Sequence, residues 1–213
     1  MKDIAIYGAG GFGREVACLI NKINAVEPTW NLIGFFDDNI APGESNGYGT
    51  IIGGIDSLNA YSSPLNLVVA IGAPQALCTV VSKIDNPNIS FPNIVSPDTL
   101  FLDADTVTMG KGNIICSRCL ISCDVSIGNF NILNGYVPVG HDATIGNCNV
   151  VMPSVNISGG VTIGDNNFFG VQSVVLQYVK VENNVRVGAA SVVMRTAKSD
   201  NLYMGNPATK VKL

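Results

Sequence analysis

The chain has 213 residues, of which 47% are hydrophobic and only 13% are charged, and its formal net charge is −4. This apolar content is ample for a folded core and excludes a mainly disordered chain. The negative charge makes nucleic acid or an anionic membrane an unsuitable partner. The sequence contains no run of about 18 apolar residues that could span a bilayer. Because the glycine-punctuated N-terminus does not resemble a secretory signal, we expect a cytoplasmic protein with reduced cysteines.

Residues 1–90 show the alternation of strand and helix that is typical of a small Rossmann-like domain. Apolar runs at residues 4–7, 32–36 and 67–71 are predicted to be buried strands, and residues 14–23 are predicted to form a helix between the first two. This βαβ order favours a parallel sheet with helices packed against it.

A glycine-rich loop follows the first predicted strand. Gly8, Gly10 and Gly13 match the spacing of a dinucleotide-binding fingerprint, and Asp37 follows at a suitable interval for a ribose contact. Taken alone, the spacing suggests NAD, but its physical content is a set of backbone N–H groups that can receive an anion at a helix N-terminus. A phosphate or a sugar could use the same loop, and so could a tight turn that binds nothing.

After a connection and first coil at residues 91–106, residues 107–196 divide into fifteen hexads without an insertion. The third residue of every hexad is apolar, and a higher period of eighteen residues appears in VTMGKGN, VSIGNFN, ATIGNCN and VTIGDNN. We interpret three hexads as one triangular coil of a parallel β-helix, with the third residues pointing inward. Glycine and asparagine are expected at the corners, where a positive φ is tolerated.

The last part of the chain is basic. Residues 180–213 include six basic and two acidic residues, and this excess of positive charge would favour a polyanionic ligand. Candidates for phosphate contacts are Arg186, Arg195, Lys198 and Lys210. The alternative is that these charges only make the last coil soluble. Residues 197–213 are predicted to be a C-terminal tail in which Pro207 stops further strand pairing.

The only histidine of the chain, His141, lies in the segment Gly140-His141-Asp142. Its hexad position is a polar corner, and an imidazole is the natural base for a reaction at neutral pH. Asp142 could orient this histidine or could be a solvated corner residue. A single histidine nearly excludes a three-histidine zinc enzyme. The closely spaced Cys116, Cys119 and Cys123 are interpreted as small packing residues, so no metal site is expected.

Both halves, in this order, resemble the hexapeptide-repeat sugar acyltransferases related to sialic-acid O-acetyltransferases and nucleotide-4-amino-sugar N-acetyltransferases. The resemblance covers essentially the whole chain and rests on YGAGGFGREVA, FFDDN, VVAIG, the hexads, GHD and GNPATKV. It implies a left-handed parallel β-helix, a homotrimer and acetyl-CoA as co-substrate. In that family the N-terminal domain holds the nucleotide-sugar, at positions that correspond to Gly10, Gly11, Asp37 and Asp38.

The resemblance also implies residue roles in the β-helix, with two departures. The family's catalytic histidine corresponds to His141, and Asp142 stands where relatives often carry glutamate. Val150 stands where many relatives have a second histidine near the thioester. We therefore expect backbone N–H groups near Gly159 and Gly160 to polarise the acetyl carbonyl, while the basic residues named above would hold the phosphates of acetyl-CoA.

The expected activity is acetyl-CoA-dependent N-acetylation of a nucleotide-linked 4-amino-4,6-dideoxy sugar for surface-glycan biosynthesis. One alternative is O-acetylation of sialic acid or another hydroxyl acceptor. A non-catalytic nucleotide-sugar-binding scaffold and an NAD-dependent dehydrogenase are further alternatives, although the β-helix would be unexplained in a dehydrogenase. The sequence does not separate an amine from a hydroxyl acceptor, or uridine from thymidine.

Overall fold

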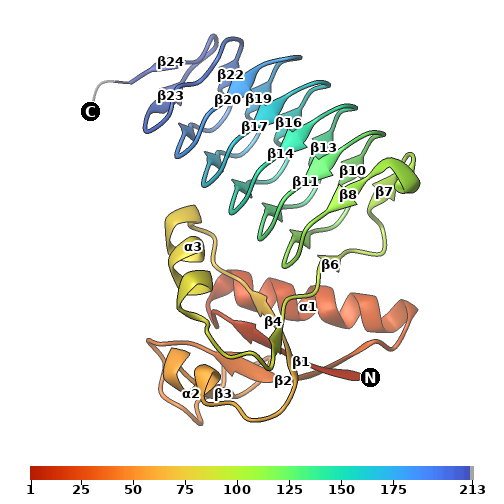
Figure 1. Cartoon of the computed structure of the whole chain (residues 1–213), viewed down its shortest axis with the longest axis vertical. Helices are drawn as coiled ribbons and strands as arrows, with labels where there is room; N and C mark the ends of the chain where they lie inside the picture. Colours follow the sequence, from red (N-terminus) through yellow and green to blue (C-terminus); the bar gives the residue numbers. More distant parts are fainter. Residues whose placement is uncertain (212–213) are drawn as a thin grey trace. The chain divides into compact units, whose positions relative to one another are not determined.

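The computed structural model describes residues 1–211 (Figure 1). The chain divides into two compact units, Met1–Pro97 and Asp98–Leu213. Among the described helices, none combines the length and the apolar character that a membrane span requires.

The first unit is a parallel α/β domain, as the βαβ pattern predicted. Its sheet has the strand order β3-β2-β1-β4-β5, and every pairing in it is parallel. The elements in chain order are β1 (Lys2–Tyr7), α1 (Gly11–Val26), β2 (Trp30–Phe36), β3 (Ile51–Gly53), α2 (Ile55–Asn59), β4 (Leu65–Val69), α3 (Pro74–Lys83), β5 (Ile89–Ser90) and β6 (Ile94–Val95). The first helix begins at Gly11, earlier than predicted, because the glycine loop itself forms its N-terminus.

The loop between β1 and α1 depends on glycine at two positions. Gly8 has a φ of +102°, and Gly13 packs directly against the Gly8 backbone. A Cβ on Gly13 would lie 2.9 Å from the carbonyl carbon of Gly8 and closer still to its oxygen. The start of α1 therefore approaches the end of β1 more closely than a side chain would permit.

We expect Gly13→Ala to lower the free energy of unfolding of the first unit by about 3 kcal/mol, because the clash is with backbone that cannot rotate away. Urea unfolding followed by circular dichroism measures this change. Gly11→Ala is the matched control, since nothing lies within 4 Å of a Cβ placed there. Equal stability of the two variants would contradict the packing role of Gly13.

The second unit is a left-handed parallel β-helix, and between residues 108 and 193 its short strands recur every six residues. They are β7 (Leu100–Phe101), the 3-10 turn η1 (Ala104–Thr106), β8 (Thr108–Met109), β9 (Ile114–Ile115), β10 (Leu120–Ile121), β11 (Ser126–Ile127), β12 (Ile132–Leu133), β13 (Pro138–Val139), β14 (Thr144–Ile145), β15 (Val150–Val151), β16 (Asn156–Ile157), β17 (Thr162–Ile163), β18 (Phe168–Phe169), β19 (Val174–Val175), β20 (Lys180–Val181), β21 (Arg186–Val187) and β22 (Val192–Val193). Every third strand belongs to the same sheet, so the coils rise as a three-sided stack (Figure 1).

The coil register confirms the eighteen-residue period. Ile127 pairs with Ile145, which pairs with Ile163, and the same offset holds in all three sheets for the strands between residues 108 and 193. Third residues of the hexads form the core, and from Ile115 to Val193 each of them is buried. A buried asparagine ladder runs beside this core. Oδ1 of Asn131 accepts both the backbone N–H and the side-chain amide of Asn149, Oδ1 of Asn149 accepts the backbone N–H of Asn167, and the Asn149 side chain also donates to the Gly164 carbonyl.

The corner geometry differs from the prediction in one respect. The left-handed conformation falls on the sixth residue of every hexad from Gly112 to Ala190, and side chains as large as Phe130 and Tyr136 adopt it. Glycines at the fourth position do not have a positive φ. They are needed for space instead, because a Cβ on Gly128 would meet the Gly146 backbone of the next coil at 2.5 Å.

The C-terminal tail also differs from the prediction. Strand pairing continues past Pro207, because β23 (Leu202–Met204) pairs with β21 and then antiparallel with β24 (Thr209–Lys210). Pro207 follows a cis peptide bond in the turn between β23 and β24. Proline therefore shapes this hairpin and does not end the pairing.

Candidate active site

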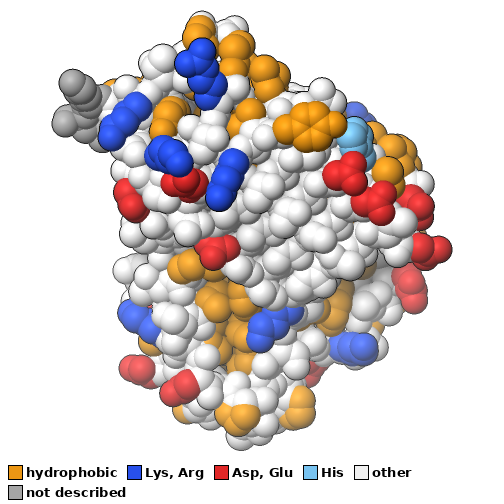
Figure 2. Space-filling model, turned by 45° about the horizontal axis from the view of Figure 1, so that its top comes forward, with side chains coloured by type: hydrophobic (Ala, Val, Ile, Leu, Met, Phe, Trp, Pro, Cys, Tyr) orange, Lys and Arg blue, Asp and Glu red, His pale blue; other side chains and the backbone are white. Residues whose placement is uncertain are grey.

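The corner that follows β13 carries His141 and Asp142. The same corner of the next coils consists of residues 158–160, 176–178 and 194–196, and we call this edge of the β-helix the histidine corner. Both side chains are exposed, with 47% of His141 and 64% of Asp142 accessible. Figure 2 shows the histidine at the surface beside Asp and Glu side chains.

The two side chains form a hydrogen bond, with 2.7 Å between Nδ1 of His141 and Oδ2 of Asp142. A carboxylate oxygen only accepts, so the neutral imidazole carries its proton on Nδ1 in this arrangement. The lone pair is then on Nε2, to which no side chain or backbone group within residues 1–211 is hydrogen-bonded. The pair is thus arranged to take a proton at Nε2.

Glycine in the next coil supports the histidine ring. A Cβ on Gly159 would lie 2.6 Å from Nε2 of His141, so the imidazole packs against the bare Cα of that residue. The Gly160 N–H donates to the His141 carbonyl oxygen at 2.8 Å. This bond corrects one prediction, since the Gly160 N–H is already used and cannot polarise a carbonyl.

The remaining candidate donor at this point is the Gly159 N–H, which donates to no acceptor among the described residues. Val150, where relatives often have a second histidine, is completely buried in β15 and presents no polar group. Polarisation of the carbonyl by backbone stays a prediction, for which the Gly159 N–H is the candidate donor.

Beyond His141, toward the C-terminus, the histidine corner becomes apolar and then basic. Leu176 and Met194 are exposed there, and Arg195 follows directly. Met194 and Arg195 line a cavity of about 260 Å³ together with residues 207–209 of the final hairpin. An arginine beside apolar walls suits a ligand that has both an anionic group and a hydrocarbon part.

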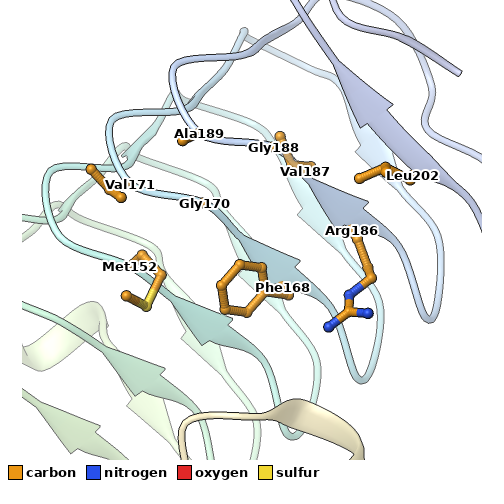
Figure 3. Close-up of a pocket in the computed structure, with 9 residues that line it drawn as sticks. All are labelled: Met152, Phe168, Gly170, Val171, Arg186, Val187, Gly188, Ala189 and Leu202. Carbon is orange, nitrogen blue, oxygen red and sulfur yellow. The ribbon is translucent and has the colours of Figure 1, made fainter. Parts of the chain in front are cut away.

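The four basic residues predicted to hold phosphates lie on different parts of the C-terminal coils. Arg186 lies on β21 and lines a different, apolar groove of about 400 Å³, where its side chain lies beside Phe168 (Figure 3). Lys198 forms an ion pair with Glu182, with 2.8 Å between Nζ and Oε1. Lys210 is exposed on β24. Of the four, only Arg195 lies on the histidine corner.

Further hydrogen bonds stabilise the ion pair between Lys198 and Glu182. Glu182 also accepts hydrogen bonds from the backbone N–H and the hydroxyl of Ser199. The hydrogen bond from Lys198, followed by that from the Ser199 backbone, lowers the pKa of the Glu182 carboxyl. Lys198 is therefore partly neutralised by the protein itself.

In the first unit, the glycine loop presents an open surface. A Cβ on either Gly10 or Gly11 would have no atom within 4 Å, so this N-terminus of α1 leaves room for a ligand. Asp37 lies next to the loop, because its Oδ2 accepts the Ala9 N–H at 2.9 Å and its Oδ1 accepts the Asn39 N–H.

Asp38 connects β1 to the N-terminus of α2. Its Oδ1 accepts the Ile55 N–H at 2.7 Å, and its Oδ2 accepts the Tyr7 hydroxyl at 2.6 Å. Burial, together with this hydrogen bond and the nearby carboxylates, raises the pKa of Tyr7. The structure thus brings Asp37 to the glycine loop and gives both aspartates structural hydrogen bonds that the sequence did not reveal.

The cysteines show no arrangement typical of a metal site. Within residues 1–211, no group of three or more His, Cys, Asp or Glu side chains is placed to hold a metal ion. Cys119 is buried, and burial raises the pKa of its thiol to about 11. A neutral buried thiol behaves as a small hydrophobic residue.

Comparison with known proteins identifies the first unit. Residues 3–84 match the PglD N-terminal domain family. We call this part of the first unit the PglD-type domain, after the family that it matches. A comparison with curated protein sequences found no significant match.

Solved structures share the fold of the whole chain, with the PglD-type domain followed by the β-helix. The acetyltransferase domain of PglB from Neisseria gonorrhoeae is 23% identical, with a TM-score of 0.89, and the alignment covers 99% of this chain and 100% of that one. PerB from Caulobacter crescentus, in complex with CoA and GDP-perosamine, is 24% identical, with a TM-score of 0.83, and covers 100% and 98%. WeeI from Acinetobacter baumannii is 24% identical, with a TM-score of 0.86, and covers 99% and 100%.

Proposed function

We propose that this protein is an acetyl-CoA-dependent N-acetyltransferase acting on a nucleotide-linked 4-amino-4,6-dideoxy sugar. The observation that carries the proposal is the hydrogen bond of His141 with Asp142, which orients Nε2 as an exposed base over Gly159. Two structures with the same fold support the chemistry: the PglB domain was solved with acetyl coenzyme A, and PerB with CoA and GDP-perosamine.

In the proposed reaction the amine of the sugar attacks the thioester carbonyl carbon. The new C–N bond forms as the amine proton passes to Nε2 of His141, and Asp142 stabilises the resulting imidazolium. Negative charge on the carbonyl oxygen would be stabilised by the Gly159 N–H. When the C–S bond breaks, CoA leaves as a thiolate and takes the proton from the imidazolium, which restores the neutral histidine.

The acyl donor would follow the histidine corner toward the C-terminal coils. The exposed apolar side chains of Leu176 and Met194 suit the pantetheine arm, and Arg195 suits a phosphate of CoA. Arg186, Lys198 and Lys210 lie on other parts of the same end and would act at longer range. In the homotrimer that we propose, this corner would face a neighbouring β-helix and the donor would lie between them.

The acceptor nucleotide would bind to the PglD-type domain. The open backbone at Gly10 and Gly11 can receive a phosphate at the N-terminus of α1, and Asp37 and Asp38 lie at the same edge of the sheet. Because both carboxylates also hold backbone N–H groups, their replacement would disturb the loop as well as the ligand.

The test is release of CoA thiol from acetyl-CoA, measured with GDP-, UDP- and dTDP-linked 4-amino-4,6-dideoxy sugars and with sialic acid. We expect rapid release with one amino sugar and formation of its N-acetyl product by mass spectrometry. Thiol release only with sialic acid would show that the acceptor group is a hydroxyl and not an amine. Binding of acetyl-CoA without turnover on any acceptor would contradict the proposed acetyltransferase activity and favour a binding role.

A further inference from the structure

Tyr178 is an exposed aromatic side chain on the histidine corner that the proposed reaction does not use. It occupies the sixth hexad position, two coils after Asp142 and one coil after Gly160, and its φ is +61°. Its side chain is 75% accessible, so the ring contributes little to the core. The left-handed backbone sets the direction in which the side chain leaves the corner.

The ring of Tyr178 lies over Gly160. A Cβ on Gly160 would be 2.5 Å from Cε1 of the ring and closer still to Cδ1, so the ring occupies the space that a side chain at 160 would need. The Tyr178 N–H donates to the Gly159 carbonyl oxygen at 3.1 Å. Gly159 therefore packs against the imidazole of His141 in the preceding coil, and Gly160 packs against the phenol ring of Tyr178 in the following coil.

In the proposed reaction, this ring would lie next to the reacting carbonyl. The carbonyl carbon must lie close to the amine that gives its proton to Nε2, and its oxygen close to the Gly159 N–H. Tyr178 is on the C-terminal side of that point, where Leu176, Met194 and Arg195 form the path proposed for the acyl donor. The ring therefore faces the donor end of the reaction.

From this placement we infer that Tyr178 limits the length of the acyl group that the site accepts. The inference rests on the proposed function, because it takes His141 and Gly159 as the centre of acyl transfer. The same C–N bond forms and the same C–S bond breaks whichever acyl chain is transferred. A methyl group needs little room beyond the carbonyl, whereas each further methylene extends toward a ring that the backbone holds in place.

The test compares acetyl-, propionyl- and butyryl-CoA as donors for wild type, Tyr178→Ala and Tyr178→Phe. We expect Tyr178→Ala to raise kcat/KM for butyryl-CoA relative to acetyl-CoA by about tenfold or more, with an intermediate gain for propionyl-CoA. Tyr178→Phe keeps the ring and should keep the wild-type preference. Tyr136→Ala is the matched control, since Tyr136 has the same hexad position and is 55% accessible on another corner.

The inference would be overturned if Tyr178→Ala changed the KM of the sugar acceptor but left the ratio of kcat/KM between butyryl-CoA and acetyl-CoA at its wild-type value. Calorimetric binding of acetyl-CoA and butyryl-CoA to the same proteins, without acceptor, separates this result from failure of the proposed function. Wild type should bind butyryl-CoA more weakly than acetyl-CoA, and Tyr178→Ala should remove the difference. If wild type shows that preference but transfers to no amino sugar, the acceptor is wrong and the role of Tyr178 stands. Equal binding of both donors by wild type, or no binding of either, would refute it.

Discussion

Replacement of His141 by asparagine is expected to lower kcat by about a hundredfold or more while the protein stays folded. Asparagine can still hydrogen-bond to Asp142 but has no nitrogen that accepts a proton near neutral pH, so the amine would attack without a base. His141 is exposed on a corner, and its removal leaves the buried third residues of the hexads untouched. Steady-state thiol release with the identified acceptor measures the change.

Two comparisons make this result specific. Acetyl-CoA should bind His141→Asn with nearly the wild-type affinity, because the proposed donor path lies on later coils. Asp142→Asn should cause a smaller loss, about tenfold, since it weakens the orientation of the imidazole and keeps the base itself. If His141→Asn lowered kcat by less than about tenfold, His141 would not be the general base.

Gly159→Ala is expected to cost about as much activity as losing the base, although it adds only one methyl group. That methyl would lie 2.6 Å from Nε2, so the ring must leave its position over the corner, and the basic nitrogen moves with it. Small displacements of a catalytic group are enough to lower a rate by about a hundredfold. The measured quantity is kcat with saturating acetyl-CoA.

Gly135→Ala is the matched control for this prediction. Gly135 has the same hexad position on another corner, and a Cβ there would meet only the Ser117 carbonyl oxygen at 3.2 Å. It should reduce activity little. The double variant His141→Asn/Gly159→Ala should be no slower than His141→Asn, because both changes act through one imidazole. Additive losses would mean that Gly159 acts on something other than the ring.

Much of the β-helix could be predicted because its contacts are periodic in the sequence. Each strand between residues 108 and 193 pairs with a strand eighteen residues away, so one repeat length sets the register of these coils. The inward position was predicted correctly for the same reason. In the first unit, β1, β2 and β4 were predicted from apolar runs, whereas β3 and α2 were missed because three and five residues are too short to show a period.

The errors concern groups whose partners lie on a neighbouring coil or strand. Gly160 was expected to polarise a carbonyl, but its N–H is taken by the His141 carbonyl. The glycines at the fourth hexad position were expected to have a positive φ and instead provide room for the next coil, whereas Gly112 and Gly160 at the sixth position do have a positive φ. The eighteen-residue period did contain a usable signal, since it places Gly159 directly above His141 and Tyr178 directly above Gly160.

By itself, the sequence determined the order of the two domains, the β-helix with its register, and His141 as the candidate base. These features depend on local periodicity and on the chemistry of single residues, which the order of amino acids contains. Only the tertiary structure decided which backbone N–H groups stay available, that Lys198 is held by Glu182, and that the Tyr178 ring packs against Gly160. Those outcomes depend on which groups of neighbouring coils come within hydrogen-bonding distance of one another.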